Sequence, residues 1–171
     1  MNIVAIDFET ADNGRDSACA IGMARVVDGT IVDQQSYLIR PPRREVRYTY
    51  IHGLRWADVA DEPTFAERWP DIQTFIGEAD YLAAHNASFD RGVMNGCCDA
   101  AGTAPPTQRW LCTVKLARQT WNIRPTKLPD VCRHLVIPLN HHDAASDALA
   151  CAKIVINAQE DGSEVVHAVL G

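Results

Sequence analysis

The pattern of apolar and polar positions begins with an almost unbroken apolar run that ends at the first acid, Asp7. A short run of this kind without helical periodicity predicts a buried strand, here over residues 2–8. Two further runs, 20–27 and 30–38, are separated by an Asp-Gly dipeptide, which is typical of a tight hairpin turn. We therefore expect three neighbouring antiparallel strands at the start of the chain.

After residue 40 the pattern alternates between helical and extended segments. Pro41 and Pro42 break the strand pattern, and the stretch as far as residue 50 is typical of an exposed loop. Apolar spacing and Pro or Gly boundaries then predict, in chain order, a helix at 64–77, a strand at 81–84, a helix at 88–101, a strand at 109–112, and helices at 113–121, 127–135 and 143–159. Residues after 161 are expected to form a tail or a short edge element.

Two of these helices carry candidate capping residues at their amino-terminal ends. Asn86 or Ser88 can cap the helix over 88–101, and Asp143 can cap the last helix. Three antiparallel strands followed by alternating strands and helices predict an α/β fold, in which a mixed five-stranded sheet is flanked by helices. Ligands in such sheets bind at strand ends where the topology changes, so a functional site is expected there.

Length and composition predict one domain over residues 1–171. The length suits a single well-filled domain, and 47% apolar with 22% charged residues argue against extended disorder. The chain has no apolar run long enough for a membrane span, and its start lacks the basic region of a signal peptide. We therefore expect a cytoplasmic protein with no membrane partner, whose six cysteines are reduced and mostly buried.

A net charge of −6 is unusual for a protein that binds nucleic acid, because affinity for phosphate comes from cations. The distribution of the cations changes this picture. Four arginines gather in one short segment and four cations in a second, looser cluster: Arg40, Arg43, Arg44 and Arg47, then Lys115, Arg118, Arg124 and Lys127. Each cluster is either a phosphate-binding surface or a solvated face.

Four carboxylates stand at positions that suit a metal site. Asp7 and Glu9 are two residues apart at the end of the first strand, and in extended backbone such side chains face the same side. Asp90 falls in the first turn of a predicted helix, and Asp147 lies near the start of the last one. Clustered carboxylates repel one another unless hard cations hold them together. This favours two Mg²⁺ or Mn²⁺ ions and phosphodiester hydrolysis by a two-metal route.

The same chemistry needs a base that takes a proton from the attacking water. Histidine is suited to this role because its ordinary pKa of about 6.5 lies near neutrality. His142 lies just before the predicted cap of the last helix, five residues from Asp147, and is the candidate. Its neighbour His141 competes for the role, and position in the predicted elements does not decide between them.

Three segments resemble the motifs of a known family. IDFET at 6–10, HNASFD at 85–90 and HDAASDA at 142–148 are similar to the three exonuclease motifs of the DEDDh (DnaQ-like) 3′–5′ exonucleases. The third segment fits the family pattern HxAxxDA when its histidine is His142. The resemblance runs from about residue 2 to residue 158, and the pieces IHGL and LCTVKLAR are similar to those of small stand-alone members.

This resemblance implies a ribonuclease-H-like fold, two divalent ions and stepwise release of 5′-mononucleotides from a 3′ end. Asp7, Glu9 and Asp147 would bind the catalytic metal. Asp7 would also bridge to a second metal, which Asp90 would reach through water. His142 would be the general base.

The resemblance also suggests contacts to the terminal nucleotide. The candidates come from the first motif, the IHGL segment and the second motif: Phe8, Thr10, His52, Leu54, Asn86 and Phe89. The first-motif residues would grip the nucleotide and its 3′-hydroxyl, and His52 or Leu54 would lie against its base. Phe89 is alternatively a core residue rather than a stacking platform, and Asn86 is alternatively a helix cap.

The activity expected from these residues is that of a 3′–5′ exonuclease acting on single-stranded or frayed DNA, in DNA repair or end trimming. An exoribonuclease of the same fold is the close alternative, because no residue visibly senses the 2′-hydroxyl. A proofreading subunit associated with a DNA polymerase is another. An inactive nucleic-acid-binding module is disfavoured, because no acid or histidine of the motifs is lost.

Overall fold

The computed structural model describes residues 1–164 and 168–169. Its centre is one five-stranded mixed sheet with the strand order β3-β2-β1-β4-β5. The strands are β1 (Asn2–Thr10), β2 (Ala18–Val27), β3 (Thr30–Leu38), β4 (Tyr81–Ala84) and β5 (Arg109–Cys112). β1 pairs antiparallel with β2 and parallel with β4, so the direction of the sheet changes at this central strand.

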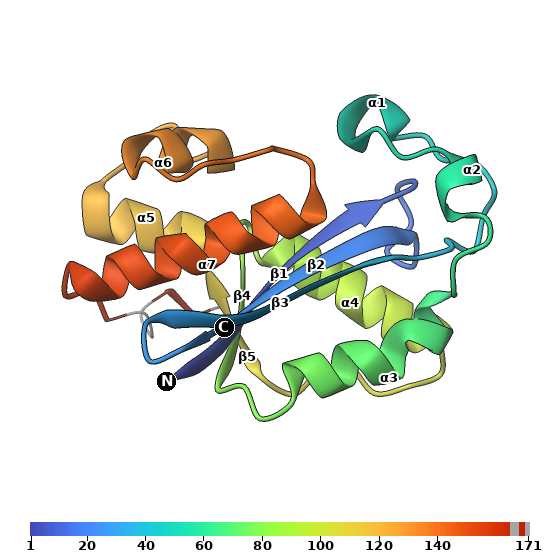
Figure 1. Ribbon diagram of the computed structural model, residues 1–171, viewed down its shortest axis with the longest axis horizontal. Helices are drawn as coiled ribbons and strands as arrows, with labels where there is room; N and C mark the ends of the chain where they lie inside the picture. Colours follow the sequence, from blue (N-terminus) through green and yellow to red (C-terminus); the bar gives the residue numbers. More distant parts are fainter. Residues whose placement is uncertain (165–167, 170–171) are drawn as a thin grey trace.

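Helices cover both faces of the sheet (Figure 1). Those on one face are α3 (Phe65–Ile76) and α4 (Ser88–Ala100); those on the other are α5 (Thr113–Trp121), α6 (Leu128–His134) and α7 (Ala144–Glu160). Two short helices, α1 (Thr49–His52) and α2 (Trp56–Val59), lie beyond the ends of β1 and β2. A mixed sheet between two helical layers is the predicted α/β architecture.

Each face of β1 belongs to a separate apolar core, and this decides where the acids point. Alternation along the strand places Ile3 and Ala5 in the core beneath α5, α6 and α7. Asp7 and Glu9 continue that row, so their side chains face the same helices. β1 is buried on both faces, and about 1.5–3 kcal/mol is gained for each large apolar side chain removed from water. The two acids are therefore carried by a firmly held strand.

The predicted boundaries lie within two residues of those in the structure. The prediction for the first strand was wrong at its end, because β1 continues from Phe8 to Thr10 as pairing with β2 extends to Ala18. The helices α1 and α2 were not predicted. Each has four residues, too few for an apolar period to be visible in the sequence.

One predicted cap is confirmed and the other is wrong. The Asp143 side chain accepts a hydrogen bond from the backbone N–H of Ser146 at 2.9 Å and caps α7. The cap position of α4 is Ala87, with no side-chain cap, rather than Asn86 or Ser88. Asn86 lies one residue before this cap and adopts a left-handed backbone with φ 62°.

Three further expectations concern the remaining chain. All six cysteines are free and buried, as predicted. The tail prediction falls partly on residues 165–167 and 170–171, which lie outside the described residues; Val169 forms an isolated antiparallel bridge with Leu111 of β5. Among the helices described, none has both the length and the apolar character that crossing a membrane requires.

Candidate active site

Three acids converge where β1 ends. Asp7, Glu9 and Asp147 each offer a carboxylate oxygen, and these ligand atoms all lie within 4.8 Å of one another. Glu9 is 9% exposed and Asp147 is 3% exposed, so little water separates the charges. The structure therefore brings together three of the four predicted acids in one small volume.

The approach of α7 to the sheet delivers Asp147. Asp7 pairs with Gly22 on β2, and a Cβ atom at Gly22 would overlap the backbone carbonyl of Ala144 at the start of α7. The glycine thus gives the helix terminus room to lie on the sheet beside Asp7. With the helix fixed by its Asp143 cap, Asp147 in the first turn faces the acids of β1.

Asp90 joins the site from the opposite face of the sheet. It lies in the first turn of α4 and is 2% exposed. Its Oδ1 accepts a hydrogen bond from the backbone N–H of Phe8 at 3.0 Å, which ties the helix to the strand between Asp7 and Glu9. Asp90 lies outside the three-acid group of ligand atoms, although its charge acts on Asp7.

Burial and mutual repulsion make the ionised forms of these acids unfavourable. Burial, then the charges of Asp90, Asp147 and Glu9, raise the pKa of Asp7 well above its ordinary value. Burial, then Asp147 and Asp90, raise the pKa of Glu9 to about 8. Burial raises the pKa of Asp90 to about 7, against the opposing effect of the Phe8 N–H. A nearby cation would stabilise all of these carboxylates.

The hydrogen bonds of Asp147 leave one oxygen for such a cation. Its Oδ2 interacts with His141 Nδ1 at 2.8 Å and accepts from the backbone N–H of His142 at 3.2 Å. Its Oδ1 is buried and has no hydrogen-bond partner among the described residues. A buried oxygen without a partner is costly unless something binds it. Three clustered carboxylates with a spare oxygen fit a hard divalent cation.

Both candidate histidines lie beside Asp147. Their rings stack, with centroids 3.7 Å apart, and His142 has a left-handed backbone with φ 70°. Burial, and then the neighbouring His141, lower the pKa of His142, so its imidazole is neutral at pH 7 and able to accept a proton. The structure thus brings His142 to the site, and also places His141 in direct contact with Asp147.

A cavity of about 410 Å³ opens on one side of the acids, and four of the predicted substrate contacts line it: Phe8, Thr10, His52 and Phe89. Phe89 is 38% exposed, so the alternative of a core residue is wrong. The guanidinium of Arg15 lies 5.3 Å from its ring centroid. Leu54 lines an adjoining cavity of about 210 Å³ together with Glu9 and His142.

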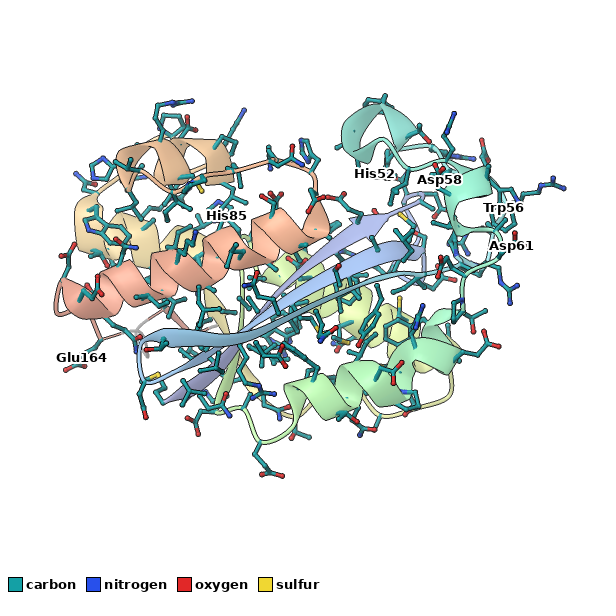
Figure 2. All side chains as sticks on the ribbon, viewed as in Figure 1. His52, Trp56, Asp58, Asp61, His85 and Glu164 are labelled. Carbon is teal, nitrogen blue, oxygen red and sulfur yellow. The ribbon has the colours of Figure 1, made fainter. Side chains whose placement is uncertain are left out.

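His52, the last residue of α1, lies near the end of β1 (Figure 2) and is held by both of its ring nitrogens. Nδ1 accepts from the backbone N–H of Leu54 at 3.1 Å, so Nε2 carries the proton and donates to the Thr10 carbonyl at 3.2 Å. Burial lowers its pKa, which keeps the ring neutral. His52 therefore fastens α1 to the end of β1, and its ring face, rather than a nitrogen, is left for a ligand.

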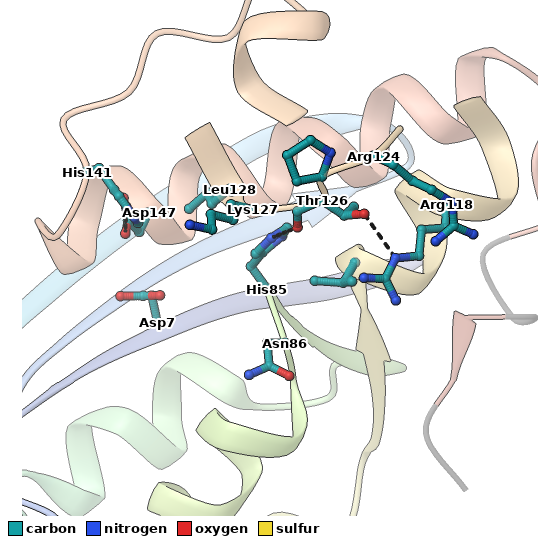
Figure 3. Close-up of a pocket in the computed structure, with 12 residues that line it drawn as sticks. Asp7, His85, Asn86, Arg118, Arg124, Thr126, Lys127, Leu128, His141 and Asp147 are labelled. Carbon is teal, nitrogen blue, oxygen red and sulfur yellow. Dashed lines mark hydrogen bonds and ion pairs between the residues drawn. The ribbon is translucent and has the colours of Figure 1, made fainter. Parts of the chain in front are cut away.

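A second cavity, of about 620 Å³, is also lined by Asp7 and Asp147 (Figure 3). Its lining includes Asn86 and three cations of the second basic cluster, Arg118, Arg124 and Lys127. His85 also lines it, although no role for this residue was predicted from the sequence. His85 is tied to Thr113 Oγ1 and the Thr126 carbonyl at 2.9 Å each, and burial lowers its pKa to about 4.

The first basic cluster is largely neutralised. Arg43 binds both Asp12 and Asp16 in the β1–β2 loop, at 2.7 and 2.6 Å. Arg47 pairs with Glu45, Arg40 lies 3.9 Å from Glu67, and Arg44 lies over the ring of Trp56. Arg40 and Arg43 thus pair with acids that are distant along the chain, so the sequence alone could not distinguish these two arginines from phosphate ligands.

A mixed sheet of this order, with acids at the end of its central strand, defines the class of ribonuclease-H-like nucleases. The model of the RNase T exonuclease family matches residues 4–155, and the chain belongs to that family. The resemblance to DEDDh exonucleases is thereby confirmed. Members of this family use divalent metal ions.

Several relatives match most of the chain. It is 33% identical over 144 residues to exodeoxyribonuclease 10 of Escherichia coli K12, covering 80% of this chain and 60% of that protein. It is 34% identical over 159 residues to a PolC-type DNA polymerase III of Clostridium perfringens, covering 89% of this chain and 11% of the polymerase. The chain thus spans less than two thirds of both relatives.

Solved structures match the fold over nearly the whole chain. Exonuclease X in complex with 5′ overhanging duplex DNA superposes with a TM-score of 0.76 and 26% identity, covering 97% of this chain and 96% of that one. The nuclease domain of 3′hExo, a DEDDh family member bound to rAMP, has a TM-score of 0.80 at 17% identity, covering 94% and 92%. The latter likeness concerns the fold alone.

Proposed function

We propose that this chain is a metal-dependent 3′–5′ exonuclease that releases 5′-mononucleotides from single-stranded or frayed DNA. The observation that carries the proposal is the group of Asp7, Glu9 and Asp147 ligand atoms within 4.8 Å, beside a neutral histidine. Relatives named as exonucleases support it, and so does the DNA-bound Exonuclease X structure. End trimming in DNA repair is the role that fits this activity.

The carboxylates would hold two divalent cations, Mg²⁺ or Mn²⁺. Asp7, Glu9 and Asp147 would bind the first, and Asp7 would also bind the second, which Asp90 would reach through water. Bound there, the ions supply Lewis-acid stabilisation of the charge that develops on the phosphate. Two observations agree with this assignment: the unpartnered Asp147 Oδ1 and the raised pKa values of the four acids. A nearby cation would bind the free oxygen and lower those pKa values.

The remaining residues position the substrate and move the proton. His142 accepts the proton of the attacking water, which its lowered pKa allows at neutral pH. The backbone of Phe8 and the side chain of Thr10 face the 3′-terminal nucleotide in the 410 Å³ cavity. Phe89 offers an exposed ring for stacking, and the ring of His52 lies against the same cavity.

Two alternative substrates or settings are favoured by particular relatives. An exoribonuclease activity is the first, because the chain shares its fold with a 3′-exonuclease bound to rAMP. Association with a DNA polymerase is the second, because PolC-type polymerases contain a segment that matches this chain. Both would use the same acids and the same histidine.

One assay tests the proposed activity. Labelled single-stranded DNA, duplex DNA and short RNA are incubated with the protein and Mg²⁺, Mn²⁺ or a chelator, and the products are identified. We expect 5′-mononucleotides from DNA, loss of activity with chelator, and resistance of substrates blocked at the 3′ end. Asp7→Ala should reduce the rate about a hundredfold or more. Internal cleavage products, or no hydrolysis with either metal, would overturn the proposal.

A further inference from the structure

The two cavities that meet at the acids differ in charge. The cavity of about 410 Å³, here called the terminal cavity, includes Phe8, Thr10 and Phe89 in its lining and, among the described residues, neither Lys nor Arg. The cavity of about 620 Å³, here called the basic cavity, includes Arg124 and Lys127. Asp7, His141 and Asp147 line both, so a ligand bound at the acids can extend into either.

A polynucleotide cut at the acids has different charge needs on its two sides. The terminal nucleoside carries the scissile phosphate and nothing more, and that phosphate lies at the acids themselves. The strand on the 5′ side adds one negative charge with every nucleotide and needs cations along its path. The cavity with cations therefore suits the continuing strand, and the cavity without them suits the terminal nucleoside.

We propose that the basic cavity binds the phosphates of the substrate strand on the 5′ side of the scissile bond, through Arg118, Arg124 and Lys127. This inference rests on the proposed function, and it sets the direction in which the strand crosses the site. The 3′-terminal nucleoside would lie in the terminal cavity, and the strand would leave past Arg124 and Lys127 in the loop between α5 and α6. Figure 3 shows where these cations line the basic cavity.

The cations of the basic cavity are available for phosphate. In the described part of the chain, Arg118, Arg124 and Lys127 form no ion pair with an acid, in contrast to Arg43 and its two aspartates. A phosphate arriving there displaces no carboxylate. In a protein with net charge −6, unpaired cations next to buried acids are the places where a polyanion can be held.

The loop that carries these cations is fixed before any ligand arrives. Arg118 Nε donates to Thr126 Oγ1 at 2.9 Å, and that hydroxyl donates to the Ile123 carbonyl at 2.8 Å. The Thr126 carbonyl is held by His85 Nε2 at 2.9 Å, which links the loop to the end of β4. Arg124 and Lys127 lie on either side of this anchored threonine, and their side chains are exposed. Because the loop is already held, its backbone loses little freedom when a ligand binds.

The test compares substrates that reach the basic cavity with one that does not. An unphosphorylated deoxydinucleotide has only the scissile phosphate, whereas a single-stranded decanucleotide has phosphates to its 5′ side. The variant is Arg124→Ala with Lys127→Ala, because Arg118 also holds the loop. Lys115→Ala is the matched control: Lys115 belongs to the same sequence cluster and is exposed, but does not line the cavity.

For the double variant we expect kcat/KM on the decanucleotide to fall about tenfold or more, through KM, with kcat and the dinucleotide rate unchanged. The slope of log KM against log salt should become shallower by about 0.7 for each cation removed, the single-strand value per phosphate. Lys115→Ala should match the parent on both substrates.

Two results would overturn the inference. One is an equal loss of kcat/KM on dinucleotide and decanucleotide, and the other is an unchanged KM and salt slope for the decanucleotide. Failure of the proposed function is distinguishable, because the unaltered protein would then hydrolyse neither substrate.

Discussion

The Asp147 carboxylate is shared between two sets of groups at the site. Its Oδ2 belongs to the histidines, through His141 Nδ1 and the backbone N–H of His142, while its Oδ1 has no partner in the described structure. Hydrogen bonds to one oxygen fix the orientation of the other, so Asp147 presents Oδ1 in a set direction. The two histidines can therefore have separate tasks, which substitution should separate.

Replacing His142 by Ala should lower the rate of the chemical step about 10²–10⁴-fold, the usual contribution of a general base. Divalent-metal affinity should persist, because the contact of residue 142 with Asp147 comes from the backbone. Single-turnover hydrolysis and Mn²⁺ titration measure the two effects. A parent-like rate would move the role of base away from His142.

Replacing His141 by Ala should act on the metal rather than on the proton. The Asp147 carboxylate loses its 2.8 Å partner and is oriented less firmly, so about tenfold or more Mg²⁺ is needed for half-maximal activity, with kcat at saturating Mg²⁺ nearly unchanged. The Mg²⁺ dependence of the rate measures this. A large loss of kcat that Mg²⁺ does not restore would instead identify His141 as the base.

For single residues, the sequence was sufficient to predict which acids lie together, but not which hydrogen bonds the site residues form. The two-residue spacing of Asp7 and Glu9 was sufficient to place them on one face of β1. The engagement of both His52 nitrogens was beyond prediction, because Thr10 and Leu54 approach the ring only after folding. The cap predicted at Asn86 or Ser88 was wrong because Ala87 takes the cap position of α4, and Asn86 before it has a left-handed backbone.

Among the elements, the contact between α7 and β2 sets the geometry of the site. Gly22→Ala should push the start of α7 off the sheet, since the new methyl would overlap the Ala144 carbonyl. We expect the free energy of unfolding to fall by about 1–3 kcal/mol, and metal affinity to fall further than this alone explains, because Asp147 moves away from Asp7.

Urea unfolding and Mn²⁺ titration of Gly22→Ala measure these two changes. Ser36→Ala is the control, because Ser36 on β3 is the pairing partner of Gly22 on β2 and its side chain is exposed. A variant that is destabilised but binds Mn²⁺ with the parent affinity would show that the close approach of α7 does not set the position of Asp147.

Elements with a visible period were predicted well, and short ones were not. α3 shows its Thr64–Glu67 capping box and its apolar face directly in the sequence. α1 and α2 depend instead on distant partners: the His52 ring fastens α1 to β1, and Arg43 fixes the preceding loop to Asp12 and Asp16. Local sequence could not predict helices that tertiary contacts hold.

For the whole molecule, the buried acids couple stability to pH. In the unfolded chain their carboxyl groups ionise near pH 4, whereas in the folded protein the pKa of Asp90 is about 7 and that of Glu9 is about 8. Between these values the folded state binds more protons than the unfolded state. The free energy of unfolding of the metal-free protein therefore decreases as pH rises from about 4 to 8.

Thermal unfolding in chelator should show a midpoint that falls between about pH 5 and pH 8. Mg²⁺ at about 100 times its dissociation constant should raise the pH 8 midpoint by about 5–10 °C, because it binds the folded acids alone. Asp12 and Asp16, whose pKa values Arg43 lowers, act in the opposite direction, but their effect is confined to pH values below about 4.

Asp7→Asn provides the matched comparison for stability, because it removes the carboxylate that is repelled by Glu9, Asp90 and Asp147. In chelator at pH 8 this variant should be more stable than the parent, with a shallower pH dependence and almost no response to Mg²⁺. A stability gain from a substitution that abolishes hydrolysis is expected where acids are held together for a cation rather than for the fold. If the thermal midpoint of the parent protein in chelator stayed constant or rose from pH 5 to pH 8, these acids would not have raised pKa values in the metal-free protein.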